Sequence, residues 1–279
     1  MRKTSWLILL FVAIWLNACG SGDSNNTNEQ QQRLFEWDHS SDFVLFQVDV
    51  IDENLPEPII ANTIPLCTIY GDGRLVFTNP TADNEIEVLE SRLNDADIRS
   101  FIEQVIGRGF YSWEDDVFNN SDLNRIESIS LNLYAQPRTV ERYGDWPNNS
   151  FEILLEDCRN LSPQRALVIP FNGGWLRAYP LESYDRTGEY LEWPRRIPFT
   201  LEEVANSGSP QWVSDPTIAA YLWNIILTQR PIPIVIRDQA FLITFQVPGI
   251  SRTSPPPPTD LTNALPTLAP LPTEEDEDN

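Results

Sequence analysis

Glycine-centred turns between short apolar runs constrain the fold of this chain more than any other feature. Gly71-Asp72-Gly73 separates the run Leu66–Tyr70 from the run Arg74–Phe77. Glycine supplies the positive φ that a tight reversal needs, so this stretch predicts a β-hairpin. Apolar alternation also predicts a strand over Phe43–Val50. Three further strand pairs are predicted: Ala166–Ile169 with Trp175–Tyr179 around Asn172-Gly173-Gly174, Ile129–Leu133 with Arg138–Tyr143, and Ile232–Ile236 with Ala240–Val247.

Several amphipathic stretches with capping residues predict helices between these strands. Asn94 is an N-cap candidate, Asp95 and Asp97 follow in the first turn, and Gly107 and Gly109 end the segment. One apolar face of this helix carries Ile98, Phe101, Ile102, Val105 and Ile106. Other predicted helices are Ser150–Glu156, the segment after the capping box Thr200-Leu201-Glu202-Glu203, and the segment after Asp215-Pro216 with Ile218, Leu222, Ile225 and Ile226 on one face. The predicted class is therefore α+β, with an antiparallel sheet built from hairpins and a few packing helices.

The aromatic and apolar residues concentrate between residues 34 and 250, which marks the globular domain. Residues 20–33 carry no apolar side chain and predict a flexible tether. Residues 251–279 are rich in proline and end in acidic residues, a composition typical of a disordered tail. The domain has either one large core or a break near Asn160–Arg165 that divides it into two subdomains.

The first residues have the pattern of a secretory signal peptide, residues 1–18. Arg2 and Lys3 precede an unbroken apolar run from Trp6 to Leu16. The alternative is a single transmembrane anchor. A run of eleven residues falls well short of the ~20 that a spanning helix needs, so we favour the signal peptide.

The segment Leu16-Asn17-Ala18-Cys19 is similar to the lipobox of bacterial lipoproteins. The resemblance implies that Cys19 is diacylated and becomes the first residue of the mature chain. It also implies a protein held by lipid on the extracytoplasmic side of a membrane in the bacterial cell envelope. The stretch Pro65–Arg74, with the Asn94–Phe110 helix after it, resembles a pattern in uncharacterised bacterial lipoproteins, which supports the fold and implies no activity.

Composition excludes several classes of function. Without residues 1–18 the chain keeps 17 of its 19 basic residues and all 41 acidic ones, a net charge of −24. Phosphate backbones would be repelled, so nucleic acid is not an expected partner. Lys3 is the sole lysine and leaves with the signal peptide, which excludes chemistry that depends on a lysine amine. His39 is the sole histidine, so we expect no metal site or other cofactor.

Cys67 and Cys158 remain as a pair in a chain predicted to be exported. An oxidising compartment favours a disulfide between them. The alternative is two buried thiols, which are common in protein cores.

Carboxylates are the catalytic chemistry still available to the chain. Trp113-Glu114-Asp115-Asp116 is the most suggestive cluster, because aromatic and acidic residues together can hold a sugar. We favour a solvated loop beside a core tryptophan, and we assign no catalytic residue.

Oxygen ligands for calcium could come from this region, although their spacing fits no known calcium loop. They are Asp115, Asp116, Asn119, Asn120, Ser121, Asp122 and Asn124. The neighbours Asp38-His39-Ser40-Ser41 contain the residue types of a serine triad, but a solvated histidine is the expected reading.

Tryptophans are numerous for one domain: Trp146, Trp175, Trp193, Trp212 and Trp223. Trp146-Pro147 and Trp193-Pro194 lie in predicted loops, where an aromatic ring either packs on proline or is exposed to a partner. We favour packing of these rings on proline.

Taken together, the sequence predicts a non-enzymatic binding or envelope-associated module with a protein or glycan partner. The alternatives are a carboxylate-dependent hydrolase acting on glycans and a small-ligand carrier.

Overall fold

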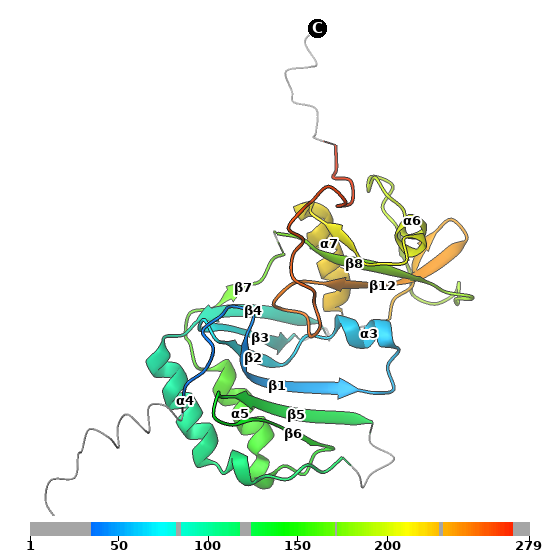
Figure 1. Cartoon of the computed structure of the whole chain (residues 1–279). Helices are drawn as coiled ribbons and strands as arrows, with labels where there is room; N and C mark the ends of the chain where they lie inside the picture. The colour runs from blue at the N-terminus through cyan, green and yellow to red at the C-terminus, as the bar shows by residue number, and fades with distance from the viewer. Residues whose placement is uncertain (1–34, 82–84, 118–123, 171, 229–230, 270–279) are drawn as a thin grey trace, which may run out of the picture.

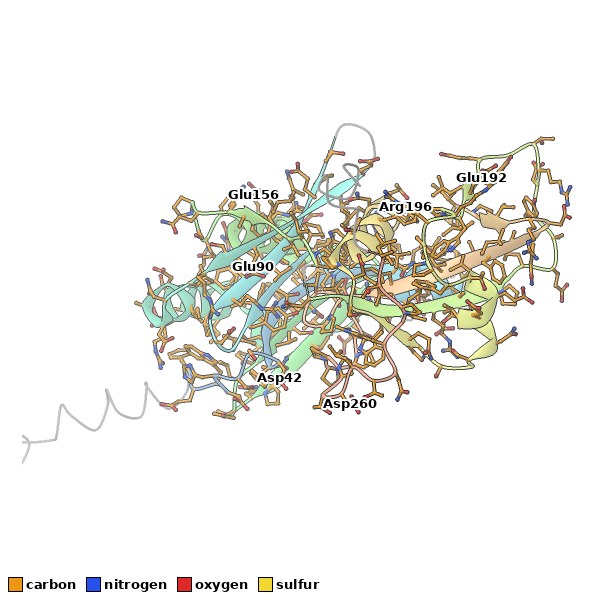
Figure 2. All side chains as sticks on the ribbon, turned by 90° about the horizontal axis from the view of Figure 1, so that it is seen from above. Asp42, Glu90, Glu156, Glu192, Arg196 and Asp260 are labelled. Atoms are coloured by element: carbon orange, nitrogen blue, oxygen red, sulfur yellow. A yellow bond between two sulfur atoms is a disulfide. The ribbon has the colours of Figure 1, made fainter. Side chains whose placement is uncertain are left out.

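The computed structural model describes residues 35–81, 85–117, 124–170, 172–228 and 231–269. The predicted signal peptide, Cys19 and the predicted tether lie outside these residues, as do 270–279. The described part is an α+β fold with largely antiparallel sheets, as the sequence predicts (Figure 1). Charged side chains such as Asp42, Glu156 and Asp260 project from its perimeter (Figure 2).

The first sheet has the strand order β6-β5-β1-β2-β3-β4-β7, and each pair of neighbours is antiparallel. Its strands are β1 (Val44–Asp52), β2 (Cys67–Tyr70), β3 (Arg74–Pro80), β4 (Ile86–Arg92), β5 (Arg125–Asn132), β6 (Pro137–Arg142) and β7 (Ala166–Leu167). The predicted β2–β3 and β5–β6 pairs are confirmed. Gly73 adopts a φ of 85° in the β2–β3 turn, the conformation for which glycine was expected.

The second sheet has the order β10-β8-β12-β11-β9. Its strands are β8 (Gly174–Pro180), β9 (Leu191–Glu192), β10 (Gln211–Val213), β11 (Ile234–Ile236) and β12 (Gln239–Gln246). The predicted β11–β12 hairpin is confirmed. The short β9–β11 pair is parallel, while the other neighbours in this sheet are antiparallel.

Helices form where capping residues and apolar periodicity coincide. The α-helices of the described residues are α3 (Glu57–Asn62), α4 (Asp95–Gly107), α5 (Ser150–Arg159), α6 (Leu201–Asn206) and α7 (Pro216–Leu227), with 3₁₀ turns at Phe110–Ser112 and Pro147–Asn149. The Asn94 side chain accepts the Asp97 amide at α4, and Thr200 and Glu203 complete the predicted capping box at α6. These predicted helices are confirmed, whereas the sequence analysis did not predict α3.

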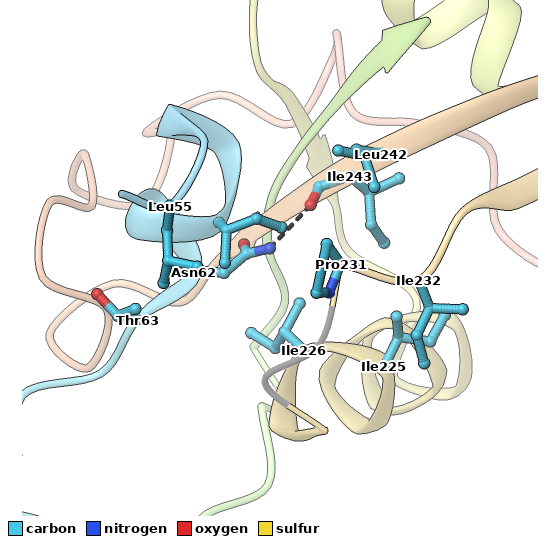
Figure 3. A pocket seen from close by; sticks show the side chains of 10 residues that line it. Leu55, Asn62, Thr63, Ile225, Ile226, Pro231, Ile232, Leu242 and Ile243 are labelled. Atoms are coloured by element: carbon cyan, nitrogen blue, oxygen red, sulfur yellow. Dashed lines mark hydrogen bonds between the residues drawn. The ribbon is translucent and has the colours of Figure 1, made fainter. Parts of the chain in front are cut away.

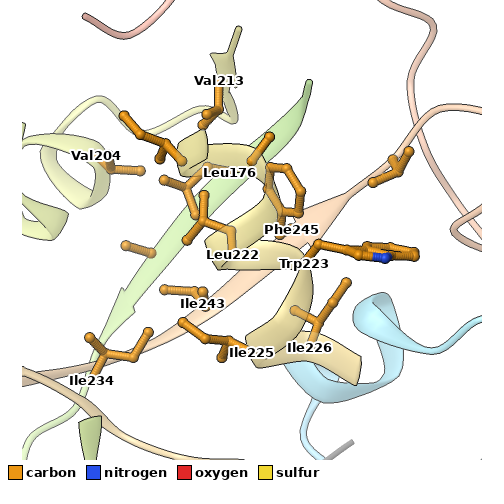
Figure 4. Close-up of a cluster of buried hydrophobic side chains, with 14 of the residues drawn as sticks. Leu176, Val204, Val213, Leu222, Trp223, Ile225, Ile226, Ile234, Ile243 and Phe245 are labelled. Carbon is orange, nitrogen blue, oxygen red and sulfur yellow. The ribbon is translucent and has the colours of Figure 1, made fainter. Parts of the chain in front are cut away.

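Alternation along the central strands separates two hydrophobic cores. On β3, Leu75 and Phe77 face α4 and α5, while Val76 between them faces the second sheet and α7. Tyr70 and Val88 join Val76 in that second core, which also contains Phe245 of β12 (Figure 4). The first sheet therefore contributes to both cores. The predicted break near 160–165 falls between α5 and β7, inside the part of the chain that builds the first sheet.

Cys67 on β2 and Cys158 on α5 are joined by a disulfide, with their sulfurs 2.02 Å apart and their Cα atoms 6.4 Å apart. Both residues are fully buried in the first core. The bond fixes α5 against the sheet.

The predicted hairpin around Asn172-Gly173-Gly174 is wrong. β7 pairs with β4, and β8 pairs with β10 and β12, so the flanking strands belong to different sheets. Gly173 has a φ of 98°, but its environment gives a second reason for glycine. A Cβ there would lie 2.1 Å from the carbonyl oxygen of Val213 on β10. The local turn signal was therefore real, but the turn joins strands that pair elsewhere.

The C-terminal segment also differs from its prediction over residues 251–269, which were expected to be disordered. The Leu265 amide donates to the Trp212 carbonyl at 2.8 Å, and the Leu268 amide donates to Asp215 Oδ2 at 2.9 Å. The side chains of Leu265 and Leu268 pack against the second core. A few apolar anchors in a proline-rich, polar segment are enough to dock it, and composition averaged over the whole tail obscures them.

Candidate functional site

An apolar pocket opens between α3, α7 and β12 (Figure 3). Its volume is about 100 Å³. The described residues that line it are Leu55, Ile59, Asn62, Thr63, Ile225, Ile226, Pro231, Ile232, Leu242 and Ile243. Aliphatic side chains from segments far apart in the sequence thus meet at one hollow beside the second sheet.

Local sequence explains where the two helices that border the pocket begin. α3 begins after Pro56 and has Pro58 in its first turn, where the missing amide hydrogen costs nothing. α7 begins at Pro216, and Asp215 caps it by accepting the Thr217 and Ile218 amides at 2.8 and 3.0 Å. Ile225 and Ile226, in the last turn of α7, border the pocket.

Asn62 fixes α3 to the second sheet. Its Nδ2 donates to the Ile243 carbonyl at 2.8 Å, and its Oδ1 accepts the Phe245 amide at 2.9 Å. The side-chain amide thereby satisfies two backbone groups of β12. The neighbouring Thr63 hydroxyl donates to the Ile60 carbonyl at 2.7 Å. The polar side chains at the pocket are therefore already engaged, and they hold the wall in place.

The chemistry of this pocket suits binding. None of the described residues that line it carries a titratable side chain. An apolar group that enters would remove aliphatic surface from water and gain dispersion contacts. Each such contact is weak alone, so the fit to the wall decides the affinity.

A buried ion pair joins β1 to the chain after β12. Arg252 Nη1 is 2.7 Å from Asp49 Oδ2, and Arg252 Nη2 donates to Asp49 Oδ1 and to the Val50 carbonyl at 2.8 and 2.9 Å. Burial raises the pKa of Asp49 to about 6, against the lowering effects of Arg252 and of the Val50 amide. Burial also lowers the pKa of Arg252. Sequence reasoning missed this pair, because β1 and the chain after β12 meet only in the folded protein.

Trp113 and the acidic residues Asp115 and Asp116 after it make structural contacts with other described residues. The Trp113 ring is 5% exposed and packs edge-on against Phe110 and Trp146. Asp115 Oδ1 accepts the Glu141 amide at 2.9 Å, and Asp116 forms an ion pair with Arg142 at 3.3 Å. The preferred reading, a loop beside a core tryptophan, is confirmed for Trp113. A buried ring cannot stack on a sugar.

The calcium candidates are only partly described. Asn119, Asn120, Ser121 and Asp122 lie outside the described residues. The Asn124 side chain donates to Asn54 Oδ1. In the part of the chain that the structure describes, no group of three or more histidine, cysteine or acidic side chains could hold a metal ion.

Trp146 and Trp193, in the predicted loops, are buried as the preferred interpretation expects, and each ring contacts other aromatic rings. Trp146 donates its Nε1 hydrogen to Glu127 Oε2 at 2.8 Å, and Trp193 donates to the Phe199 carbonyl at 2.9 Å. Trp212 and Trp223 are also buried. Trp175 is partly exposed and contacts the C-terminal segment, which the sequence analysis did not predict.

His39 is exposed, and its ring centroid lies 4.9 Å from that of Trp37. Its neighbour Asp38 accepts the Ser40 amide at 2.9 Å in a local turn. The arrangement is that of a solvated histidine, as expected.

Comparisons with known proteins assign no family. No protein-family model, curated protein or solved structure gives a significant match to this chain. Within the described residues, no helix combines the length and the apolar character needed to cross a membrane. Cys19, the predicted lipidation site, lies outside those residues.

Among the described residues, the aliphatic pocket between α3, α7 and β12 is the best-defined candidate site. Sequence reasoning could not have found it, since Leu55–Thr63 and Ile225–Ile243 carry only ordinary apolar patterns.

Proposed function

We propose that this chain is a lipid-anchored protein that acts as a non-enzymatic binding module on the extracytoplasmic side of a bacterial membrane. The observation that carries the binding role is the aliphatic pocket between α3, α7 and β12. Its volume of about 100 Å³ is somewhat below the roughly 150 Å³ of a cavity that accepts benzene. The ligand is therefore a small molecule with a compact aliphatic group, of the size of a leucine side chain. This is the small-ligand carrier that the sequence analysis gives as an alternative, and it differs from a module with a protein or glycan partner.

The anchor rests on the lipobox-like segment that ends at Cys19. Two acyl chains hold a protein at a membrane stably, whereas one gives marginal binding. The acidic chain would be repelled by anionic lipid, so the acyl chains must carry the attachment.

The pocket is tested with 2-methyl-1-propanol as the probe, using the full chain with labelled isoleucine methyl groups. We expect the methyl signals of Ile226 and Ile243 to shift and saturate with a dissociation constant of about 1 mM, which corresponds to roughly 4 kcal/mol of binding free energy. Leu55→Trp should abolish the saturable shift, because the larger side chain fills the pocket mouth. Leu167→Trp introduces the same side chain at a residue that is 57% exposed on β7, away from the pocket, and should bind as the wild type does. A shift that never saturates, or an equal response in Leu55→Trp, would contradict the binding role.

The anchor is tested separately by phase partitioning of the protein from bacterial membranes. The wild type should enter the detergent phase at its processed mass, and Cys19→Ser should stay unprocessed and unacylated. Ser21→Ala, two residues further on, is the matched control and should behave as the wild type. An acylated or membrane-bound Cys19→Ser protein of mature mass would refute the lipid anchor.

A further inference from the structure

The segment after β12 lies along one edge of the second sheet, where it contacts β8 and β10. Residues 251–269 leave the end of β12 and run past α7 in Figure 1. We call this segment the C-terminal strap. Pro255, Pro256 and Pro257 are exposed, so this part of the strap rests on the surface, whereas Leu265 and Leu268 pack against the second core.

Trp175, whose ring packs on that of Trp212, contacts the proline-rich part of the strap. Trp175 on β8 is the register partner of Trp212 on β10, and their rings meet edge-to-face with centroids 5.2 Å apart. The Trp175 Nε1 hydrogen is donated to the Pro256 carbonyl at 3.1 Å. Four consecutive prolines favour the extended polyproline II conformation, which leaves backbone carbonyls free to accept hydrogen bonds. An aromatic surface with an indole donor is a common way to bind such segments.

The second half of the strap is held by groups that recognise an extended backbone. β10 is an edge strand of the second sheet, and its Trp212 carbonyl accepts the Leu265 amide at 2.8 Å. Asp215 uses Oδ1 to cap α7 and Oδ2 to accept the Leu268 amide at 2.9 Å. Leu268 also borders a small hollow with Ile218 and Tyr221. The site therefore binds a proline carbonyl and two amide hydrogens through hydrogen bonds, and it packs against two leucine side chains spaced three residues apart.

We propose that this surface is a peptide-binding site for extended segments that contain proline and leucine, and that the strap is its built-in competing ligand. The occupant in trans is a segment of another protein with the same chemistry as residues 254–269. The strap is tethered next to its site, where effective concentrations of linked ligands reach the millimolar range. A partner therefore gains access when its local concentration is high or when the strap is weakened. The peptide-binding site shares no residue with the aliphatic pocket and does not involve the lipid anchor.

The first test uses a fluorescent synthetic peptide of residues 254–269 and full chains that differ in their own strap. Leu265→Ser/Leu268→Ser weakens the strap and should expose the site. We expect this variant to bind the peptide at tens of micromolar and the wild type to bind it at least tenfold more weakly. A peptide carrying the same two serine substitutions should not bind either chain.

Site variants in the strap-weakened chain test the proposed contacts. Trp175→Phe keeps an aromatic ring but removes the donor to Pro256, so peptide affinity should fall about threefold to tenfold. Tyr179→Phe, on the same strand and away from the strap contacts, should leave affinity unchanged. Equal binding by wild-type and strap-weakened chains, or no binding by a strap-weakened chain with a native circular dichroism spectrum, would overturn the proposal. A dimer that exchanges straps would also overturn it, because the strap would then be a fixed structural element.

A second measurement needs no variant. In the wild type, millimolar unlabelled peptide should accelerate hydrogen exchange at the Leu265 and Leu268 amides by displacing the strap. The Leu75 amide on β3 serves as the internal control and should not change. Unaltered exchange at both strap amides would overturn the proposal even if the strap-weakened chain failed to fold.

Discussion

Arg252 Nη1 lies 2.7 Å from Asp49 Oδ2, although 203 positions separate the two residues in the sequence. The pair joins β1, inside the first sheet, to the start of the C-terminal strap. Both side chains are largely buried, at 12% and 5% exposure. A charge pair in this position holds two distant segments together at the cost of desolvating both groups.

Removing the positive partner should destabilise the fold. Arg252→Met keeps the length of the side chain but leaves Asp49 buried without a counter-charge. We expect the free energy of unfolding at pH 7 to fall by about 3 kcal/mol in urea titrations. Arg186→Met is the matched control, because its pair with Asp238 is exposed, and its unfolding free energy should equal that of the wild type. Equal stability of Arg252→Met and wild type would show that the pair does not hold the strap.

The pair should also give stability a distinct pH dependence. The pKa of Asp49 in the folded protein is about 6, above its usual 3.8, because burial disfavours the carboxylate. The contribution of Asp49 to stability is therefore fully present below pH 4 and is lost as the pH rises through 6. Relative to Asp49→Asn, the unfolding free energy of the wild type should decrease by up to about 3 kcal/mol between pH 4 and pH 7.5. A difference that grows with pH would indicate a lowered pKa instead.

The disulfide should contribute strongly to stability, because Cys67 and Cys158 are 91 positions apart. Closing a loop of this length restricts the unfolded chain, and the chain-entropy model gives roughly 4–5 kcal/mol. Cys67→Ala/Cys158→Ala should lose about that much unfolding free energy in urea titrations. The double variant should also be insensitive to reductant, unlike the wild type. Two alkylatable thiols in unreduced wild-type protein would contradict the bond.

Gly71 should not tolerate a side chain. A Cβ there would lie 1.8 Å from the Asp38 carbonyl oxygen, a backbone atom with little freedom to move. The Gly71 carbonyl also accepts the Trp37 Nε1 hydrogen at 3.0 Å, so displacement would break a buried hydrogen bond. We expect Gly71→Ala to lower the thermal midpoint and to cost about 2–3 kcal/mol. Gly107→Ala, where nothing lies within 4 Å of the added Cβ, should be neutral or slightly stabilising. Similar midpoints for both variants would rule out this close packing.

Sequence signals predicted those elements whose cause is local. The Asn94 cap and the apolar face after it define α4, and Gly73 defines the β2–β3 turn. Capping bonds and positive φ angles involve residues a few positions apart, so a short window contains the whole cause. The α+β class followed from the sum of such elements.

The candidate sites could not be predicted in the same way. The aliphatic pocket needs Leu55–Thr63 beside Ile225–Ile243, and the strap site needs Trp175, Trp212 and Asp215 beside residues 254–269. The turn at Asn172-Gly173-Gly174 illustrates the limit, because its glycines were recognised but the partners of β7 and β8 were not. Strand pairing depends on which distant apolar faces can be buried together, and one segment alone does not contain that information.

The sequence by itself determined many of the helices and strands, several turns and the strongly acidic character, and it contains the lipobox-like segment that predicts a lipid anchor at Cys19. The tertiary structure decided which strands share a sheet, where a hollow remains between helices and sheet, and which surface receives the C-terminal strap. The physical reason is range: backbone conformation and capping act over a few residues, whereas burial, ion pairing and docking act between residues that only folding brings together.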